Sequence, residues 1–211
     1  MKLVVGLGNP GPGYADTRHN VGVRVIERLA ARHAIALDAL RFDSRFGCGR
    51  LRASADAGPP SASADAPEVA LLAPQTFMNR SGAAVAAAVA ALPLGDASED
   101  LWVVFDDVDL RFGRLRLRRS GGAGGHRGLA DVIDALGHRD FPRLRVGVGR
   151  PPDGGDTADH VLDPFSADER ARLPGLLERA AQALECALRA GVTIAMNEFN
   201  RDPDAVTPEN G

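Results

Sequence analysis

Short apolar runs recur along the chain and are bounded by glycine, proline or charged residues. Runs of this kind are typical of buried strands. We expect strands at 2–5, 42–52, 68–73, 101–105 and 144–148. A further strand is expected where Arg114, Arg116 and Arg118 alternate with Leu115 and Leu117. This alternation places the arginines on one face and the leucines in the core.

Between these strands the apolar residues recur at helical spacing. We expect helices at 20–34, 81–92, 127–136, 166–188 and 192–199. Asn20 and Ser81 stand where a polar side chain caps a helix, and Ser166 with Glu169 forms a capping box. Pro174 is expected to break the long helix near the end of the chain, because proline removes a hydrogen bond and clashes with the preceding turn.

Strands that alternate with helices predict an α/β fold. We expect a single-domain three-layer α/β/α architecture with a mixed, mainly parallel central sheet, formed by residues 1–200. Residues 53–67 consist only of Ala, Ser, Asp, Gly and Pro. This composition is too poor in bulky apolar side chains to pack, so a flexible hairpin insert is expected there. Residues 201–211 are expected to form a disordered tail.

The apolar stretches are all interrupted well before the roughly 18 residues that a membrane span needs. The chain also enters a strand pattern directly, without the layout of a signal peptide. We therefore expect a cytoplasmic protein with no membrane partner. Cys48 and Cys186 lie far apart and lack the nearby Cys or His of a zinc site, so both are interpreted as buried thiols.

The charge of the chain argues against general attraction to nucleic acid, because the formal net charge is -3. An RNA site would need local clustering, and the arginine strand provides it. Arg143 and Arg145 repeat the same alternation further along. Of the 25 basic residues only Lys2 is lysine. Two explanations of this preference for arginine are equally good. One is codon bias, and the other is a demand for guanidinium groups that bind phosphate.

The glycine turn after the first strand matches G-x-G-x-x-G, the dinucleotide-binding fingerprint. That fingerprint must open a helix directly and be followed about 20 residues later by an acidic residue at the end of a second strand. Here Pro12, Gly13 and Tyr14 lengthen the loop, and Glu27 falls inside a predicted helix. A nucleotide-dependent oxidoreductase is therefore the weaker alternative.

His19 stands directly before a predicted helix, whose N-terminal dipole favours the neutral imidazole that a general base requires. A neighbouring carboxylate would fix the tautomer and orientation of that imidazole. Asp106 is the candidate partner, because it ends a buried strand at the same edge of the sheet. A surface or capping role for a lone histidine in this position is the alternative.

Asn9 and Asn79 both follow strands, and amides placed there can hold a peptide or an attacking water without a change of charge. Local capping is their ordinary role. The glycine run at 121–125 allows a backbone to approach a ligand closely, and it leads into a helix whose N-terminal amides favour anions. A flexible connector is the alternative interpretation.

A magnesium site at Asp106, Asp107 and Asp109 is not expected. Neighbouring residues on a strand face opposite sides, so Asp106 and Asp107 cannot both contribute to one carboxylate cage. Phe77 and Met78 fit either the core or the wall of a pocket. We therefore expect no metal and no cofactor.

Taken together, six segments resemble the bacterial peptidyl-tRNA hydrolase family. They are VGLGNPGPGYADTRHN, PQTFMNRSG, FDDVDL, GGAGGHRGL, RLRVGVGRP and AMNEFN, in the order and at roughly the spacing of that family. The resemblance extends from residue 2 to about residue 200. It implies hydrolysis of the ester that joins a peptide to the 3′ end of tRNA, which recycles tRNA from stalled translation. Nothing in the sequence requires more than a monomer.

The resemblance also implies roles for individual residues. His19 would activate water with the help of Asp106, and Asn9 and Asn79 would position the substrate and stabilise the oxyanion. The remaining implied residues are Tyr14, Phe77, Met78, His126 and Arg127 around the peptide and the 3′ end, and Arg118 and Arg145 as a clamp on the tRNA 5′ phosphate.

Two features depart from the family pattern. Arg127 stands where the family usually has asparagine, and the 53–67 segment is longer than expected. A non-catalytic RNA-binding protein on the same scaffold is the main alternative function, although the presence of His19, Asp106, Asn9 and Asn79 argues against it.

Overall fold

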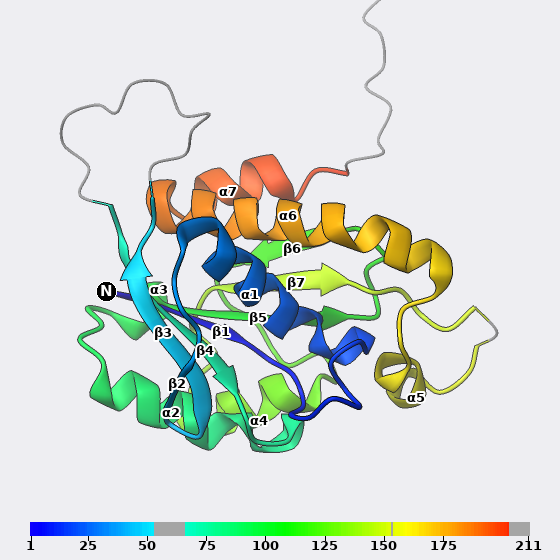
Figure 1. Cartoon of the computed structure of the whole chain (residues 1–211), viewed down its shortest axis with the longest axis horizontal. Coiled ribbons are helices and arrows are strands. Elements are labelled where there is room, and N and C mark those ends of the chain that lie inside the picture. Colours follow the sequence, from blue (N-terminus) through cyan, green and yellow to red (C-terminus); the bar gives the residue numbers. More distant parts are fainter. Residues whose placement is uncertain (53–65, 153, 203–211) are drawn as a thin grey trace, which may run out of the picture.

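The computed structural model describes residues 1–52, 66–152 and 154–202. Most of the insert expected at 53–67 and of the tail expected at 201–211 lies outside these residues. Within them, seven strands form one sheet in the order β2-β3-β4-β1-β5-β7-β6 (Figure 1). The strands are β1 (Lys2–Gly6), β2 (Ala39–Arg41), β3 (Ser44–Arg50), β4 (Glu68–Pro74), β5 (Leu101–Asp107), β6 (Leu115–Arg118) and β7 (Arg143–Gly147).

The sheet is mixed, as expected, and its centre is parallel. Strands β4, β1, β5 and β7 run in one direction, whereas β2 and β3 on one side and β6 on the other pair in antiparallel fashion. The carboxyl ends of the four parallel strands therefore meet at one edge of the sheet. Because the chain builds outward from β1 to β4 and then crosses to β5, the gap between β1 and β5 is a topological switch point, where open α/β sheets bind ligands.

Helices cover both faces of the sheet and complete the three layers. Helices α1, α6 and α7 lie on one face, and α2 and α4 lie on the other (Figure 1). The helices are α1 (Val21–His33), α2 (Ser81–Ala91), α3 (Ala97–Asp100), α4 (Arg127–Leu136), α5 (Thr157–Leu162), α6 (Ala167–Ala190) and α7 (Val192–Phe199), with 3₁₀ turns η1 (Arg18–Asn20) and η2 (Met78–Arg80).

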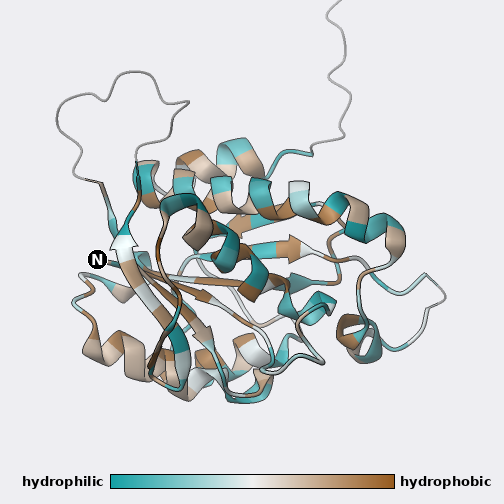
Figure 2. Ribbon diagram, viewed as in Figure 1, coloured by the Kyte–Doolittle hydropathy of each residue, from teal (hydrophilic) through white to brown (hydrophobic). Residues whose placement is uncertain are grey.

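Alternate residues of each central strand supply two separate cores. On β1, Val4 packs beneath α1 and α6, whereas Leu3 and Val5 pack beneath α2 and α4. Leu115 and Leu117 of β6 are buried, as their alternation with arginine predicts. Figure 2 shows the hydrophobic central strands and the alternation of hydrophilic and hydrophobic residues along α1 and α6.

The secondary structure departs from the sequence expectations in three respects. The strand expected from residue 42 begins at Ser44, because Phe42 and Asp43 both have positive φ in a two-residue turn after β2. Pro174 does not break α6, since Leu173 and Leu176 beside it are buried against the sheet and hold the helix in place. The short elements β2, α3 and α5 were not expected.

Helix capping also differs between sites. The capping box of Ser166 and Glu169 is confirmed at the start of α6. Ser81, in contrast, is the first residue of α2 rather than its cap, and its hydroxyl donates to the carbonyl of Met78 at 2.9 Å. Asn20 precedes α1 but does not cap it with its side chain, because that side chain is used elsewhere.

Candidate active site

A cavity of about 870 Å³ opens at the carboxyl ends of β1 and β5. Its walls are the loop after β1, the turn η2, the glycine-rich segment before α4, and α5. The first turn of α1 approaches the strands closely enough to bring His19 over the end of β5. This approach depends on glycine, because a Cβ atom at Gly22 would lie 2.4 Å from the carbonyl oxygen of Val104.

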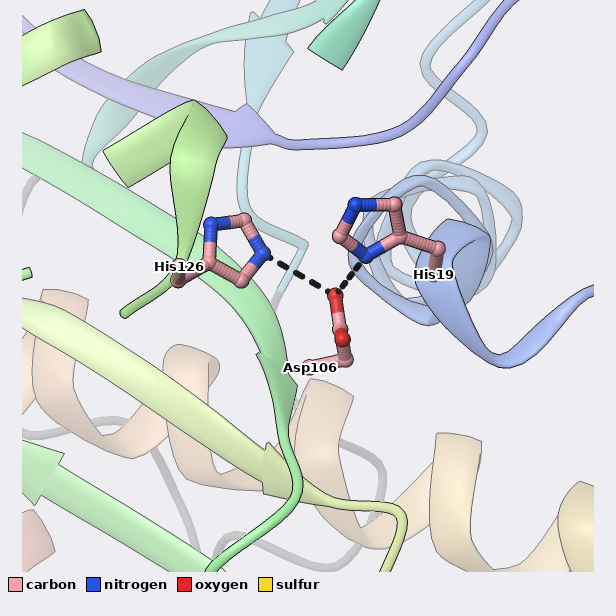
Figure 3. A group of neighbouring side chains, drawn as sticks. All are labelled: His19, Asp106 and His126. Atoms are coloured by element: carbon pink, nitrogen blue, oxygen red, sulfur yellow. Dashed lines mark hydrogen bonds and ion pairs between the residues drawn. The ribbon is translucent and has the colours of Figure 1, made fainter. Parts of the chain in front are cut away.

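Two histidines converge on one carboxylate oxygen in this cavity (Figure 3). The Nδ1 atom of His19 lies 2.8 Å from Oδ1 of Asp106, and the Nε2 atom of His126 lies 3.0 Å from the same oxygen. Three distant segments supply these residues: η1, the end of β5, and the turn that opens α4. The expected pairing of His19 with Asp106 is thus present in the geometry, and His126 joins it.

The remaining hydrogen bonds define the tautomer of each ring. Nδ1 of His126 accepts from the backbone N–H of Leu129 at 3.0 Å and so caps α4. The proton of His126 must then be on Nε2, from which it is donated to Asp106. His19 donates to Asp106 through Nδ1 in the same way. The Nε2 atom of His19 is left as an acceptor, and Figure 3 shows it directed away from Asp106.

Asp106 is buried, with 3% of its side chain exposed. Burial on its own raises the pKa of a carboxyl group, but the charges and hydrogen bonds of His126 and His19 outweigh that effect and hold the pKa of Asp106 below its ordinary value. The carboxylate therefore stays ionised at neutral pH. An ionised carboxylate is the form that can accept from both rings and stabilise a cation on His19.

Asn9 and Asn20 fix the loop that faces His19. The side-chain amide of Asn20 accepts from the backbone N–H of Asn9 at 2.8 Å and donates to the carbonyl of Asn9 at 2.9 Å. The Oδ1 atom of Asn9 in turn accepts from the backbone N–H of Met78 at 2.8 Å. Because Oδ1 is engaged, the Nδ2 group is the part of Asn9 that can donate to a ligand in the cavity it lines.

Most of the other expected site residues also line the cavity. Asn79 and Phe77 are exposed there, Met78 is buried beside Gly128, and Arg127 is exposed at the first position of α4. Tyr14 is the exception. It lies outside the cavity lining found in the described residues, in a turn where its carbonyl accepts from Thr17.

The two arginines expected to form a phosphate clamp differ in their surroundings. Arg118 is exposed on the cavity wall, whereas Arg145 is half-buried and its Nε donates to the carboxylate of Asp107. Asp107 thus faces away from the histidines, as expected for a residue adjacent to Asp106 on a strand. The expectation was wrong for Arg143, since alternation suggested an exposed side chain and the residue is buried.

The glycine fingerprint of a dinucleotide site is not formed. After Gly11 the chain continues through a turn and η1 before α1 begins at Val21. The glycines therefore do not present the first turn of a helix to a pyrophosphate.

One group of residues has the composition of a metal site. The potential ligand atoms of His19, Asp106 and His126 lie within 4.8 Å of one another. In the tautomers derived above, however, both rings direct an N–H at Asp106, and the other nitrogen of His126 is engaged with Leu129. A cation would have to displace both of these protons. The expected lack of a metal requirement stays a prediction.

Sequence reasoning missed one contributor to this site. Arg18, beside His19, is buried and forms an ion pair of 2.7 Å with Glu169. It also donates to the carbonyls of His160 and Asp163 around the end of α5, so it ties η1 to the α5 wall. The buried position of Arg18 depends on partners more than 140 positions away in the chain, and no local pattern indicates them.

Comparison with known proteins gives a consistent result. The family model described as "Peptidyl-tRNA hydrolase" matches residues 3–207. A peptidyl-tRNA hydrolase of Syntrophotalea carbinolica is 46% identical over 200 residues, with 95% of this chain and 97% of the relative covered. One from a Synechococcus species is 48% identical over 202 residues, covering 95% of this chain and 83% of the relative.

Solved structures agree with the sequence comparisons. The crystal structure of peptidyl-tRNA hydrolase from Acinetobacter baumannii superposes with a TM-score of 0.81 at 33% identity, covering 95% of this chain and 94% of that one. In the described residues, no helix is both long and apolar enough to cross a membrane. Because the family model matches residues 3–207 and these relatives are 46% and 48% identical, the chain belongs to the peptidyl-tRNA hydrolase family.

Proposed function

We propose that His19 is the general base with which this chain hydrolyses the ester bond between a peptide and the 3′ end of tRNA. The observation that supports this role is the Nε2 atom of His19, which has no hydrogen-bond partner among the described residues and belongs to a side chain that lines the cavity, while Nδ1 is held by Asp106 at 2.8 Å. In the proposed reaction, Nε2 removes a proton from water as the water attacks the ester carbonyl.

Asp106 stabilises the imidazolium that forms on His19. Because Asp106 is buried and ionised, its charge acts in a medium with little screening. His126 does not compete for the proton of the attacking water, since its Nδ1 lone pair is occupied by the N–H of Leu129. We assign His126 to holding the carboxylate of Asp106 in place and lining the site of the 3′ end.

Amide groups stabilise the oxyanion of the tetrahedral intermediate. The Nδ2 group of Asn9 is oriented by the bond between its Oδ1 and Met78, so its donor direction is set before substrate arrives. Asn79, exposed in the next turn of the cavity wall, positions the peptide and the attacking water. When the intermediate collapses, His19 returns the proton to the ribose oxygen, which departs as an alcohol.

The cavity also explains how a blocked amino terminus is selected. Amides and carbonyls can receive the first peptide group without a change of charge. A free ammonium group there would lose its hydration without gaining a counter-charge, since Asp106 and Asp107 are already engaged with His19 and with Arg145. We therefore assign N-blocked aminoacyl-tRNA and peptidyl-tRNA as the substrates.

Arginines at the mouth of the cavity bind the tRNA. Arg118 is exposed and Arg127 makes no hydrogen bond or ion pair with the part of the chain that the structure describes. With Arg145, they concentrate positive charge at the cavity although the net charge of the chain is -3. All of these residues come from one chain, so a monomer suffices for the reaction.

The first experiment compares hydrolysis of N-acetyl-aminoacyl-tRNA and free aminoacyl-tRNA by the purified protein, with and without EDTA. We expect release of the acetylated amino acid at the same rate in both buffers, and far slower release from the free aminoacyl-tRNA. Equal rates on the two substrates would disprove the selection mechanism. Loss of activity in EDTA, restored by added metal, would replace the metal-free mechanism with one centred on His19, Asp106 and His126.

A further inference from the structure

Arg143 is a buried cation that the hydrolytic mechanism does not use. It lies on β7, and 2% of its surface is exposed. Leu144 and Val146 face the core beneath α1 and α6, so Arg143 faces the other side of the sheet. On that side lies the glycine-rich segment at 121–125, which lines the cavity.

Within the described residues, the guanidinium group of Arg143 donates only to backbone carbonyls. Nη1 donates to Gly121 at 2.6 Å and to Gly122 at 3.4 Å. Nη2 donates to Arg139 at 2.7 Å, and both Nη2 and Nε donate to Phe141 at 3.3 Å. The group also stacks on the ring of Phe141, with 4.5 Å between its central carbon and the ring centroid.

These carbonyls belong to the two segments that flank α4. Gly121 and Gly122 precede the helix, whereas Arg139 and Phe141 follow it. One side chain therefore connects the entry and the exit of α4. The residue at the entry is His126, whose ring caps α4 and donates to Asp106. Movement of the entry segment would change the position of that ring and of the cavity wall together.

The electrostatic setting makes this arrangement specific for arginine. In the described residues no carboxylate lies within ion-pair distance of Arg143, and carbonyl dipoles surround the charge instead. Burial lowers the pKa of Arg143 to about 10, so the group stays charged at neutral pH. Lysine cannot reproduce the planar fork that reaches two segments at once.

We propose that Arg143 is a positioning residue that holds the glycine-rich cavity wall and the ring of His126 in their catalytic arrangement. Arg143 is itself among the residues that line the cavity, but we assign its effect to the groups that it holds rather than to contact with the substrate. The proposal rests on the role given above to His126 and Asp106. Displacing a catalytic arrangement by about 1 Å can reduce the rate about a hundredfold, so a loss of the fork should lower turnover more than tRNA binding.

The test replaces Arg143 with lysine and measures kcat, KM and the NMR signal of the Nε2–H of His126. We expect Arg143→Lys to lower kcat between about tenfold and a hundredfold, with little change in KM, and to shift or broaden the His126 signal. The matched control is Leu176→Ala, which destabilises the core beneath α6 and should leave kcat and the His126 signal unchanged at temperatures where it is folded.

A milder variant covers the case in which Arg143→Lys does not fold. Phe141→Leu removes the ring on which the guanidinium stacks but keeps every carbonyl, and it should change kcat and the His126 signal in the same direction by a smaller factor. If both variants lost stability while kcat and the signal matched Leu176→Ala, Arg143 would be structural only. Failure of the proposed function is recognised in a separate variant. If His19 were not the general base, His19→Ala would keep wild-type turnover, irrespective of the result for Arg143→Lys.

Discussion

The two ends of α1 each place a histidine against a buried carboxylate. His19 stands just before the helix and is hydrogen-bonded to Asp106 at 2.8 Å. His33 is the last residue of the helix, and its Nε2 lies 3.5 Å from a carboxylate oxygen of Glu185. By composition the two pairs are alike, and a search for histidine–carboxylate pairs would select both.

Their surroundings differ. Arg32 and Arg189 also bind Glu185, each at 3.1 Å, and Nδ1 of His33 accepts from the backbone N–H of Arg52 at 3.0 Å. The proton of His33 is thus on Nε2, next to Glu185, and no lone pair is free. At the other end of α1 the free lone pair of His19 faces a cavity. Access for a substrate and an unused acceptor, rather than the pair itself, distinguish the catalytic end from the structural end.

The largest expected effect comes from removing the histidine at the catalytic end. His19→Ala should reduce kcat by about 10² to 10⁴, the usual contribution of a general base, while stability and tRNA binding persist. His33→Ala is the matched variant and should lower stability but leave kcat unchanged. Steady-state kinetics and urea unfolding of both variants check this. Wild-type turnover in His19→Ala would show that His19 is not the general base.

Removing the carboxylate at the structural end should cost stability instead. Glu185→Ala leaves Arg189 without its carboxylate and leaves Arg32 with Glu178 alone. Loss of one member of a buried ion pair destabilises by about 3 kcal/mol. We expect that decrease in the free energy of unfolding from urea titration, with kcat unchanged in the folded protein. A large loss of kcat without destabilisation would show that the two ends of α1 are coupled.

The two ends should also respond differently to acid. Burial lowers the pKa of His33 below 6.5, against the opposing charge of Glu185 and with the help of Arg189, Arg32 and Arg52. The unfolded chain then binds more protons than the folded one as the pH falls below 6.5, so stability decreases in that range. The lowered pKa of Asp106 acts in the same direction only below its ordinary value of 3.8.

Urea unfolding at pH 7.5 and pH 5.5 separates these contributions. The wild type should lose more stability between the two pH values than His33→Gln, which keeps an acceptor for Arg52 but cannot titrate. The carboxylate of Asp106 stays ionised at both pH values, so its own titration does not contribute to this difference. If His33→Gln showed the same pH dependence as the wild type, another group would control stability in this range.

The smallest effect is expected at the mouth of the cavity. Arg127→Asn should raise KM less than about tenfold and reduce the slope of log KM against log salt by about 0.7 to 0.9, as for the loss of one phosphate contact. Arg50→Asn, an exposed arginine at the amino edge of the parallel strands, is the control and should change neither value. An unchanged salt slope in Arg127→Asn would show that Arg127 contacts no phosphate.

Much of the fold could be predicted because its determinants are local. Alternation of Leu115 and Leu117 with arginine indicated a strand, and Ser166 with Glu169 marked the start of α6. The pairing of His19 with Asp106 could also be predicted. His19 stands directly before the first helix, and Asp106 ends a strand at the same edge of the sheet.

The rest depends on partners that lie far away in the chain. Asn20 has the composition of a helix cap, but the backbone of Asn9 offers it two bonds instead. Arg143 has the spacing of a surface residue, but carbonyls of two flanking segments surround it. Pro174 has the character of a helix breaker, but the burial of its neighbours keeps α6 continuous. In each case tertiary contacts outweigh a local preference.

The contact between β1 and α1 limits how this family member can evolve. A Cβ atom at Gly6 would lie 2.4 Å from the carbonyl oxygen of Gly22, and one at Gly22 would lie equally close to that of Val104. Even alanine at either position would push α1 away from the sheet and carry His19 with it. Selection should remove single mutations at these two glycines. The distance between His19 and Asp106 therefore depends on two residues that lack a side chain.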